Sequence, residues 1–353
     1  MAQSVVKQDI KNIIKEIKKE AEQLEGRTLL ISGGAGFLGS YIVAAIYELN
    51  KKILKAPCKV ISIDNFITGR KHRISKEIKD ENFIFIDADV TKPTEIKDTV
   101  DYIIHAAGLA SPVYYQKHPL ETIESAVFGS KNLLELARQK NVKSFLYFSS
   151  SEIYGDPDPN FIPTPETYRG NVSSIGSRAC YDESKRLGET ICMTYHTLYD
   201  IPVKIVRPFN VYGPGMLPND YRVVPMFISR ALKKEPLPVH DKGNQTRTFC
   251  YISDAVTGFL KVLLSKQDGE VYNVGNDDNE INMIGLARVV GQLFNNKIEI
   301  QTIPYPKHYP KEEPKRRCPD LKKIKTTLGY APRVTLKQGL KRVITWYKNE
   351  HIL

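Results

Sequence analysis

A tyrosine and a lysine four positions apart, Tyr181 and Lys185, are the residues of this 353-residue chain that most clearly suggest chemistry. On a helix, positions four apart share a face, so the two side chains point the same way. A free phenol has a pKa of about 10 and is a poor base at neutral pH. An ammonium group beside it favours the phenolate and lowers that pKa towards the working range. The pair therefore predicts a general base, Tyr181, assisted by Lys185.

A hydroxyl and a carboxylate, those of Ser150 and Glu152, precede this pair along the chain. A tyrosine and a lysine at this spacing are common on solvated helix faces, so the pair alone is weak evidence of catalysis. Its position downstream of Ser150, Glu152 and a glycine-rich phosphate-binding loop favours catalysis instead. We therefore predict a catalytic set of Ser150, Glu152, Tyr181 and Lys185.

The glycine-rich loop contains Gly33, Gly36 and Gly39. It follows a predicted apolar strand, Arg27–Ser32, and opens a predicted helix that runs from Phe37 to about Leu49. Glycines at this spacing allow a tight turn, a close approach of the backbone to a pyrophosphate, and close contact between helix and strand. The helix N-terminus adds free N–H groups and the positive end of a dipole. The loop therefore predicts a dinucleotide site.

Asp64 lies at the end of the next predicted strand, Lys59–Ile63. A carboxylate at this position accepts hydrogen bonds from the adenosine ribose 2′-hydroxyl and repels a 2′-phosphate. Asp64 therefore predicts NAD as the cofactor rather than NADP. Arg70 and Lys71 nearby keep a 2′-phosphate site open as the alternative, unless both are simply solvated.

Further residues at strand ends complete the predicted cofactor site. Asp89 and Val90, after the third strand, could hold the adenine, although capping a loop is an equally good role for Asp89. Ala107 is expected beneath the nicotinamide, whereas His105 is expected to be packed at its strand end rather than to act as a base. The predicted cofactor-binding residues are Gly33, Gly36, Phe37, Leu38, Gly39, Asp64, Asn65, Asp89, Val90, Ala107, Tyr181 and Lys185.

Strands that alternate with helices along the first half of the chain predict an α/β fold. This is a Rossmann-type doubly wound parallel sheet covered on both faces. After Arg207 frequent prolines break the chain into short elements, which is typical of a binding lobe built from loops. The expected organisation is an N-terminal amphipathic helix (1–26), an NAD-binding domain (27–207), and a smaller C-terminal substrate-binding lobe (208–353) that interleaves with it. The predicted strands are 27–32, 59–63, 83–86, 102–105, 145–149 and 203–206.

The first segment, residues 5–24, places its apolar residues at helical spacing and predicts an amphipathic helix. We expect this helix to pack on the body of the protein or on a neighbouring subunit. Gly26 is expected to end it.

The net charge of +11 does not predict a nucleic-acid-binding protein. Most of the excess lies between residues 307 and 353, where 13 Lys and Arg face four Asp and Glu, with no interleaved aromatic platform. A solvated basic face explains it, or a few of these cations meet an anionic substrate.

Cysteine usage and hydropathy indicate a cytoplasmic protein that is not bound to a membrane. No apolar run approaches the length of a membrane span, and the first 25 residues are interrupted by Lys and Glu, unlike a signal peptide. The five cysteines show no metal-ligand spacing, so we expect reduced thiols and no metal site.

Together these motifs resemble the extended short-chain dehydrogenase/reductase family of NAD-dependent nucleotide-sugar enzymes, over nearly everything from Arg27 to Trp346. Two departures are Ser150, where the family usually has Thr, and Ser184, where it has Gly. The most specific motifs are similar to those of the UDP-glucuronate decarboxylases within the family. These are Gly170-Asn171-Val172, Arg178-Ala179-Cys180-Tyr181-Asp182-Glu183 and Arg317-Cys318-Pro319-Asp320.

The resemblance implies a redox-neutral cycle in which NAD is reduced and then reoxidised. Tyr181 would take the proton of the sugar 4-hydroxyl, and Ser150 would donate to the same oxygen. Lys185 would hold the nicotinamide ribose, and Glu152 would organise the ring hydroxyls or a water that reprotonates C5. The 4-keto sugar would lose its C6 carboxylate as carbon dioxide and yield UDP-xylose.

The resemblance also implies residues for a nucleotide-sugar substrate, with a UDP-sugar favoured. Arg247 is the best candidate for the pyrophosphate, because a guanidinium grips phosphate bidentately. Asn210 and Arg222 are candidates for the nucleotide, and Tyr115 and Arg178 for the sugar. A loop or interface hydrogen bond is the alternative role for each of these four.

Three rival functions remain open at this point. A nucleotide-sugar 4,6-dehydratase shares the motifs but often has an Asp where this chain has Ser151. A 4-epimerase needs no carboxylate at Glu152, and a catalytically idle binding protein would not need the intact catalytic set. The dehydratase is the first alternative and the 4-epimerase the second.

Relatives pair through two long helices from each subunit, so the resemblance implies a homodimer joined by a four-helix bundle. Two suitable stretches are Glu121–Lys140 and the helix that runs from Tyr181 to about Tyr199.

Overall fold

A seven-stranded, fully parallel sheet forms the centre of the computed structural model, which describes residues 2–220, 222–278, 280–305 and 314–350. The strand order is β11-β6-β5-β4-β1-β2-β3, so the predicted Rossmann-type fold is confirmed. The strands are β1 (Thr28–Ser32), β2 (Lys59–Asp64), β3 (Phe83–Asp87), β4 (Tyr102–His105), β5 (Ser144–Phe148), β6 (Val203–Pro208) and β11 (Glu270–Val274).

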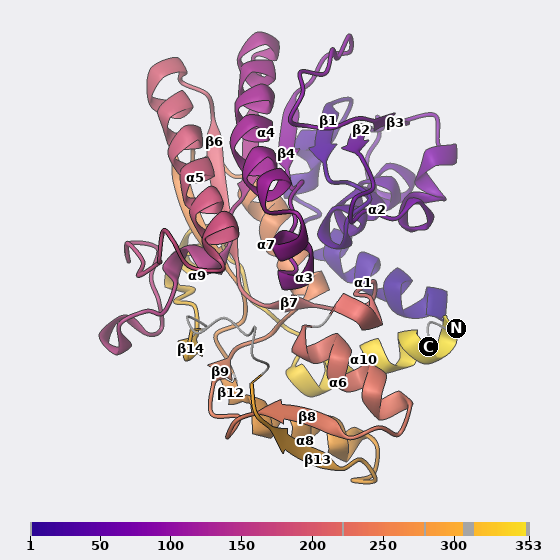
Figure 1. Cartoon of the computed structure of the whole chain (residues 1–353). Helices are drawn as coiled ribbons and strands as arrows, with labels where there is room; N and C mark the ends of the chain where they lie inside the picture. The colour runs from indigo at the N-terminus through magenta and orange to yellow at the C-terminus, as the bar shows by residue number, and fades with distance from the viewer. Residues whose placement is uncertain (1, 221, 279, 306–313, 351–353) are drawn as a thin grey trace.

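Helices cover both faces of this sheet (Figure 1). They include α2 (Phe37–Lys52), α4 (Pro119–Lys140), α5 (Ala179–Tyr199) and α7 (Ile252–Leu263). In β1, Leu29 and Ile31 pack into the core that α2 and α7 share, whereas Leu30 packs into a second core with α4 and α5. Because side chains alternate between two covered faces, the strands read as continuous apolar runs, which made them predictable.

The N-terminal segment is two elements rather than one helix. Helix α1 spans Ala2–Glu16, and a 3₁₀ helix, η1, spans Glu20–Leu24 after a turn. The prediction of a single helix over 5–24 is therefore wrong in its second half, although Ile13, Ile17 and Ala21 are all buried. Helix α1 packs against α2, α7 and α10 (Leu336–Asn349), and α1 and α10 lie side by side in Figure 1.

Apart from α7, α10 and β11, the chain beyond β6 folds into short elements, most of which gather at one end of the sheet (Figure 1). Strand β8 pairs with β13, and β9 lies between β12 and β14. Within the described ranges, no helix combines the length and the apolar composition needed to cross a membrane. The elements are β7 (Val211–Tyr212), η6 (Pro218–Asp220), α6 (Val223–Leu232), β8 (Leu237–His240), β9 (Thr246–Arg247), β10 (Cys250–Tyr251), β12 (Ile281–Asn282), α8 (Met283–Leu293), β13 (Ile300–Ile303), β14 (Arg316–Arg317) and α9 (Lys322–Leu328).

Short helices at the ends of the sheet strands complete the fold. They are η2 (Lys71–Ile74), η3 (Glu77–Lys79), α3 (Pro112–Lys117), η4 (Ser151–Tyr154) and η5 (Pro159–Phe161). Two of them, η2 and η4, directly follow segments that carry predicted site residues, so their position fixes where those side chains lie.

Candidate active site

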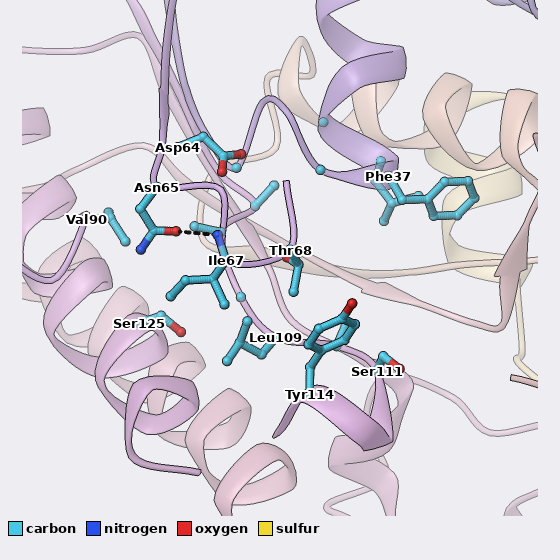
Figure 2. Close-up of a pocket in the computed structure, with 18 of the residues that line it drawn as sticks. Phe37, Asp64, Asn65, Ile67, Thr68, Val90, Leu109, Ser111, Tyr114 and Ser125 are labelled. Atoms are coloured by element: carbon cyan, nitrogen blue, oxygen red, sulfur yellow. Dashed lines mark hydrogen bonds between the residues drawn. The ribbon is translucent and has the colours of Figure 1, made fainter. Parts of the chain in front are cut away.

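A cavity of about 210 Å³ lies where four sheet strands end, at β1, β2, β3 and β4 (Figure 2). This is the crevice in which parallel α/β sheets bind dinucleotides. Ten of the twelve predicted cofactor-binding residues line it, namely Gly33, Gly36, Phe37, Leu38, Gly39, Asp64, Asn65, Asp89, Val90 and Ala107. The other two, Tyr181 and Lys185, line a second cavity that adjoins it.

The glycine loop fits a pyrophosphate because side chains are sterically excluded from it. Gly33 has a φ of +78°, and a Cβ there would lie 2.8 Å from the backbone nitrogen of Ala107. A Cβ on Gly39 would lie 2.1 Å from the carbonyl oxygen of Gly33. Helix α2 starts after Gly36 with no side-chain cap, so its first N–H groups are available to an anion. NAD is the group that this loop would hold.

Asp64 both faces the cavity and holds the glycine loop. Its Oδ2 accepts a hydrogen bond from the backbone nitrogen of Ala35 at 3.0 Å, and its Oδ1 accepts one from that of Phe66 at 2.9 Å. Burial raises the pKa of Asp64, while the two backbone N–H groups lower it. Next to it, Asn65 accepts from the nitrogen of Ile67 at 3.3 Å, which orders the rim of the cavity (Figure 2).

Asp89 combines the two roles that the sequence left open. It lines the cofactor cavity, and its Oδ1 accepts a hydrogen bond from the nitrogen of Thr91 at 2.9 Å, as a loop cap does. His105 is buried, with ring nitrogens 2.8 Å from the hydroxyl of Ser32 and 3.1 Å from the carbonyl oxygen of Ser125. Burial lowers the pKa of His105 to about 3, so the ring stays neutral and packed.

The second cavity, of about 720 Å³, brings together all the predicted catalytic and substrate-binding residues. It shares Phe37, Gly108 and Arg222, among others, with the cofactor cavity, so the two spaces adjoin. The predicted residues that line it are Tyr115, Ser150, Glu152, Arg178, Tyr181, Lys185, Asn210, Arg222 and Arg247.

Tyr181 lies in the first turn of α5 and is buried against Tyr115. The two rings are stacked, with centroids 5.2 Å apart and planes inclined by 15°. Burial raises the pKa of Tyr181 to about 12, against a smaller lowering by a hydrogen bond with Ser150. The lowered pKa predicted for Tyr181 is therefore not found in the protein alone, where loss of hydration dominates and the groups that lower the pKa are Ser150 and Arg222.

Lys185 is buried one turn further along α5. Its Nζ donates to the carbonyl oxygen of Phe148 at 2.8 Å, and a Cβ on Gly108 would lie 3.3 Å from that Nζ. Burial lowers the pKa of Lys185 to about 8. Glycine at position 108 thus leaves room for the ammonium group between the two cavities.

Glu152 is held between two arginines, one of which sequence reasoning did not place in the site. Arg178 pairs with one carboxylate oxygen of Glu152, and Arg317 contacts both, with Nη1–Oε1 and Nη2–Oε2 distances of 2.6 and 2.7 Å. On its other side, Nε of Arg178 lies 3.4 Å from Oδ2 of Asp182, whose pKa burial and Glu152 both raise. The Arg317 motif was visible in the sequence, but nothing local linked it to Glu152.

The other residues predicted to bind substrate line the cavity and are also held by hydrogen bonds or ion pairs within the protein. Arg247 donates to the carbonyl oxygens of Thr246 and Pro314 at 2.8 and 2.7 Å. Asn210 donates to that of Thr248 at 2.9 Å, and Nη2 of Arg222 pairs with Asp220 at 2.7 Å. Both predicted roles, substrate contact and loop hydrogen bond, are therefore compatible with their positions.

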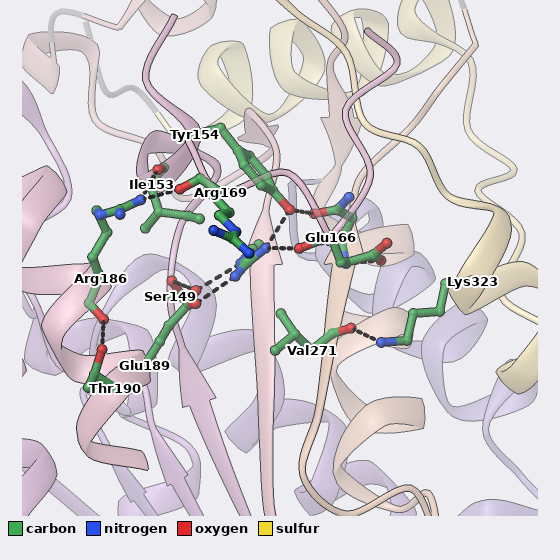
Figure 3. A network of polar contacts seen from close by, with 12 residues as sticks. Ser149, Ile153, Tyr154, Glu166, Arg169, Arg186, Glu189, Thr190, Val271 and Lys323 are labelled. Carbon is green, nitrogen blue, oxygen red and sulfur yellow. Dashed lines mark hydrogen bonds and ion pairs between the residues drawn. The ribbon is translucent and has the colours of Figure 1, made fainter. Parts of the chain in front are cut away.

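A buried polar network connects strands of the sheet to the helix that carries Tyr181 and Lys185 (Figure 3). Arg207 on β6 grips Glu189 with two bonds, Nε–Oε1 at 2.8 Å and Nη2–Oε2 at 2.6 Å. Glu189 lies one turn after Lys185 on α5 and accepts the hydroxyl of Ser149, which directly precedes Ser150. Glu189 therefore links both β6, through Arg207, and the end of β5, through Ser149, to the helix that carries Tyr181 and Lys185.

Known proteins share this architecture over most of the chain. UDP-glucuronic acid decarboxylase 3 of Arabidopsis thaliana is 43% identical over 312 residues, which is 88% of this chain and 86% of that protein. The structure of an epimerase from Methanothermobacter thermautotrophicus matches with a TM-score of 0.82 and 27% identity, covering 96% of this chain and 98% of that one. That of UDP-glucuronic acid 4-epimerase from Bacillus cereus, in complex with UDP-glucuronic acid and NAD, matches with a TM-score of 0.76 and 25% identity, covering 92% and 99%.

The family assignment rests on an independent match as well. The family description that fits residues 29–275 is "NAD dependent epimerase/dehydratase family", and its cofactor is the one that Asp64 and the glycine loop predict. The predicted enzyme class and NAD cofactor are thereby confirmed. This chain belongs to the NAD-dependent epimerase/dehydratase family of enzymes.

Proposed function

We propose that this enzyme converts UDP-glucuronate into UDP-xylose and carbon dioxide through a 4-keto sugar. The observation that carries the proposal is the Glu152 carboxylate, held by Arg178 and Arg317 in the same cavity as Tyr181 and Ser150. The similarity to curated UDP-glucuronic acid decarboxylases, over most of both chains, supports the same activity.

Oxidation at C4 of the sugar is the first task of the proposed catalytic set. When bound, NAD would supply a cationic ring that accepts a hydride from C4 and later returns it. Tyr181 removes the proton of the 4-hydroxyl, and the hydroxyl of Ser150 donates to the same oxygen. Ser150 and Arg222 both lower the Tyr181 pKa, which favours the phenolate that this step needs. When Lys185 is protonated, its ammonium group places a positive charge one helical turn from Tyr181.

Loss of carbon dioxide then needs no base at C5. The C6 carboxylate is β to the new ketone, so the C5–C6 bond breaks and its electron pair forms an enolate. The oxygen of that enolate accepts hydrogen bonds from Tyr181 and Ser150. A proton then adds to C5 in place of the lost carboxylate, and Glu152, with Arg178 and Arg317, positions the ring or the water that delivers it.

The cavity suits an anionic nucleotide sugar. Five of its described lining residues are arginines, and a guanidinium can bind the diphosphate or the C6 carboxylate of UDP-glucuronate through two hydrogen bonds. Arg247 is proposed for the pyrophosphate, Asn210 and Arg222 for the nucleotide, and Tyr115 and Arg178 for the sugar. The five arginines are Arg178, Arg222, Arg230, Arg247 and Arg317.

A 4,6-dehydratase would use Glu152 differently. There the carboxylate must itself take the C5 proton, often beside an Asp where this chain has Ser151. Here both oxygens of Glu152 are engaged by guanidinium groups, which disfavours proton abstraction. A 4-epimerase needs no such carboxylate, so the Arg178–Glu152–Arg317 cluster favours the decarboxylase over both rivals.

Product analysis with UDP-glucuronate tests the proposal directly. We expect release of carbon dioxide and a UDP-pentose, which in deuterated water carries a single deuterium at C5. Glu152→Gln should slow protonation at C5 more than oxidation at C4. A product that retains all six sugar carbons, formed by enzyme with bound NAD, would sink the decarboxylase proposal and favour the dehydratase or epimerase.

The chain organisation and assembly belong to the same proposal. We propose an N-terminal element (1–26), an NAD-binding domain (27–207) and a nucleotide-sugar lobe (208–353) that interleaves with it; β11 of the central sheet comes from that last segment. A homodimer would form through α4 and α5, which pack together and expose apolar side chains such as Phe128 and Leu187. The five cysteines are free thiols, which supports a location in the reducing cytoplasm.

A further inference from the structure

Two arginines from distant parts of the chain line the cofactor cavity, and their charges are balanced differently. Arg222 pairs with Asp220, through Nε and Nη2. Arg73, from η2, has no carboxylate within ion-pairing distance in the described part of the chain. A partly buried cation on which the carboxylates of Asp220 and Asp64 act only from beyond ion-pairing distance can still take an anionic ligand.

The known contacts of Arg73 leave most of its hydrogen-bonding capacity available. Its Nη1 lies 3.4 Å from the carbonyl oxygen of Ala35, and its Nη2 donates to that of Gly215 at 2.6 Å. A guanidinium has five N–H groups, and neither contact carries a negative charge. Burial, with Arg70 as a second cause, lowers the pKa of Arg73 to about 10, so the side chain remains a cation at neutral pH.

Arg73 is placed directly at the glycine loop. Ala35, whose carbonyl oxygen it contacts, belongs to this loop, and the nitrogen of Ala35 donates to Asp64. On the opposite side, a Cβ on Gly215 would lie 3.4 Å from the Phe37 ring, at the start of α2. Arg73 therefore spans the space between the loop and the Gly215 segment, beside the N-terminus that would receive a phosphate.

We propose that Arg73 is a ligand of the NAD pyrophosphate, and that it links the glycine loop to the segment around Gly215 when the dinucleotide binds. The pyrophosphate is the anion that reaches this part of the cavity, because the loop and the α2 N-terminus are built for it. A planar guanidinium can bind two phosphate oxygens while its Nη2 keeps the contact with Gly215. The inference rests on NAD binding and not on the proposed decarboxylation.

A 2′-phosphate of NADP is the competing ligand for a cation near Asp64. In that case the loss of Arg73 would weaken NADP binding and leave NAD unchanged. A purely structural role is the other competitor, because Arg73 also satisfies the carbonyl of Gly215. Each of these three roles predicts that a different set of ligands loses affinity when Arg73 is replaced. A panel of ligands therefore distinguishes them.

The test is titration of the nucleotide-free full-length protein with NAD, NADP, ADP and adenosine, for wild type, Arg73→Met and Arg73→Lys. Arg73→Met should weaken NAD and ADP by about tenfold to a hundredfold, which is the range for a charge-assisted hydrogen bond. Arg73→Lys keeps the charge but loses the planar guanidinium, so its affinity for NAD and ADP should lie between those of wild type and Arg73→Met. Adenosine, which has no phosphate, should bind all three proteins equally, and salt should weaken NAD binding less in Arg73→Met than in wild type.

Lys79→Gln is the matched control. Lys79 is an exposed cation at the end of η3, close along the chain, and it does not line the cofactor cavity. Its replacement should leave NAD affinity within about twofold of wild type. Equal weakening of adenosine and NAD by Arg73→Met, weakening of NADP alone, or no change in NAD affinity would each overturn the proposal, whatever reaction the enzyme catalyses.

Discussion

The guanidinium of Arg317 grips the carboxylate of Glu152 with two bonds, 2.6 and 2.7 Å long, across 165 residues of chain. Arg317 reaches this position because β14 pairs in parallel with β9, in register with Arg247. The C-terminal part of the chain thus adds a residue to the cavity that holds the catalytic set, whose members lie between Ser150 and Lys185. A bidentate pair fixes the orientation of the carboxylate as well as its charge.

Arg317→Gln should lower kcat by about a hundredfold, because Glu152 loses the partner that orients it next to the sugar. The KM for UDP-glucuronate should change less, and deuterium incorporation at C5 should slow. The neighbouring Arg316 gives a matched control, because it pairs with Glu280 at 2.7 Å on the exposed side of β14. Arg316→Gln should leave kcat nearly unchanged; equal losses in both variants would contradict the role given to Arg317.

Tyr181→Phe should lower turnover by about a hundredfold to ten-thousandfold, the range for loss of a proton-transfer group. The ring still stacks on Tyr115, so folding should survive, and the thermal midpoint should stay close to that of wild type. Steady-state kinetics and a thermal melt on the same preparation check both statements. Near-normal activity of this variant would show that another group takes the 4-hydroxyl proton.

Lys185 should make the stability of the nucleotide-free protein depend on pH. Burial lowers its pKa to about 8, from 10.5 in the unfolded chain, so the unfolded state binds more protons between those values. Stability should therefore rise as the pH increases from 8 to 10.5, by about 3 kcal/mol from this residue. Lys185→Met should lack this gain, which urea denaturation at pH 7 and pH 10 measures. A parallel pH dependence in both proteins would contradict the low pKa.

Local patterns in the sequence were sufficient for the sheet and for the main site residues. The strands are apolar runs because both of their faces are covered, and glycine at 39 reflects a contact with Gly33 made within one strand–loop–helix unit. Tyr181 and Lys185 could be paired because a helix alone sets their relation. Such features depend on neighbours a few residues away.

Long-range features could not be predicted in the same way. The contact between Arg317 and Glu152 depends on the pairing of two short strands far apart in the chain. The raised pKa of Tyr181 depends on burial beneath Tyr115, and burial is a property of the assembled structure. Likewise, the turn between α1 and η1 interrupts the helix without interrupting the apolar spacing, since Ile17 and Ala21 are both buried, so the spacing does not record it.

Asp9 should anchor α1 to the rest of the protein. Its buried carboxylate accepts hydrogen bonds from the hydroxyl of Tyr251 at 2.7 Å and from Nη1 of Arg342 at 2.9 Å. Asp9→Ala should lower the free energy of unfolding by about 1–3 kcal/mol, because it leaves a buried hydroxyl without its acceptor. Lys11→Ala, at an exposed position of the same helix, should have almost no effect. Denaturant titration that finds equal losses for both would contradict the anchoring role.

Phe128→Asp should separate the proposed dimer into monomers. Phe128 lies on α4, which packs against α5, and its side chain is 52% exposed in the single chain. A carboxylate buried in the four-helix contact would lose hydration without a partner, so association should weaken strongly. Phe161 offers a control, because it is 48% exposed but lies in η5, outside both helices. Light scattering at micromolar concentration should give twice the chain mass of 40.1 kDa for wild type and Phe161→Asp, and the chain mass for Phe128→Asp. A wild-type mass of one chain would reject the dimer, and a dimeric Phe128→Asp would move the contact away from α4.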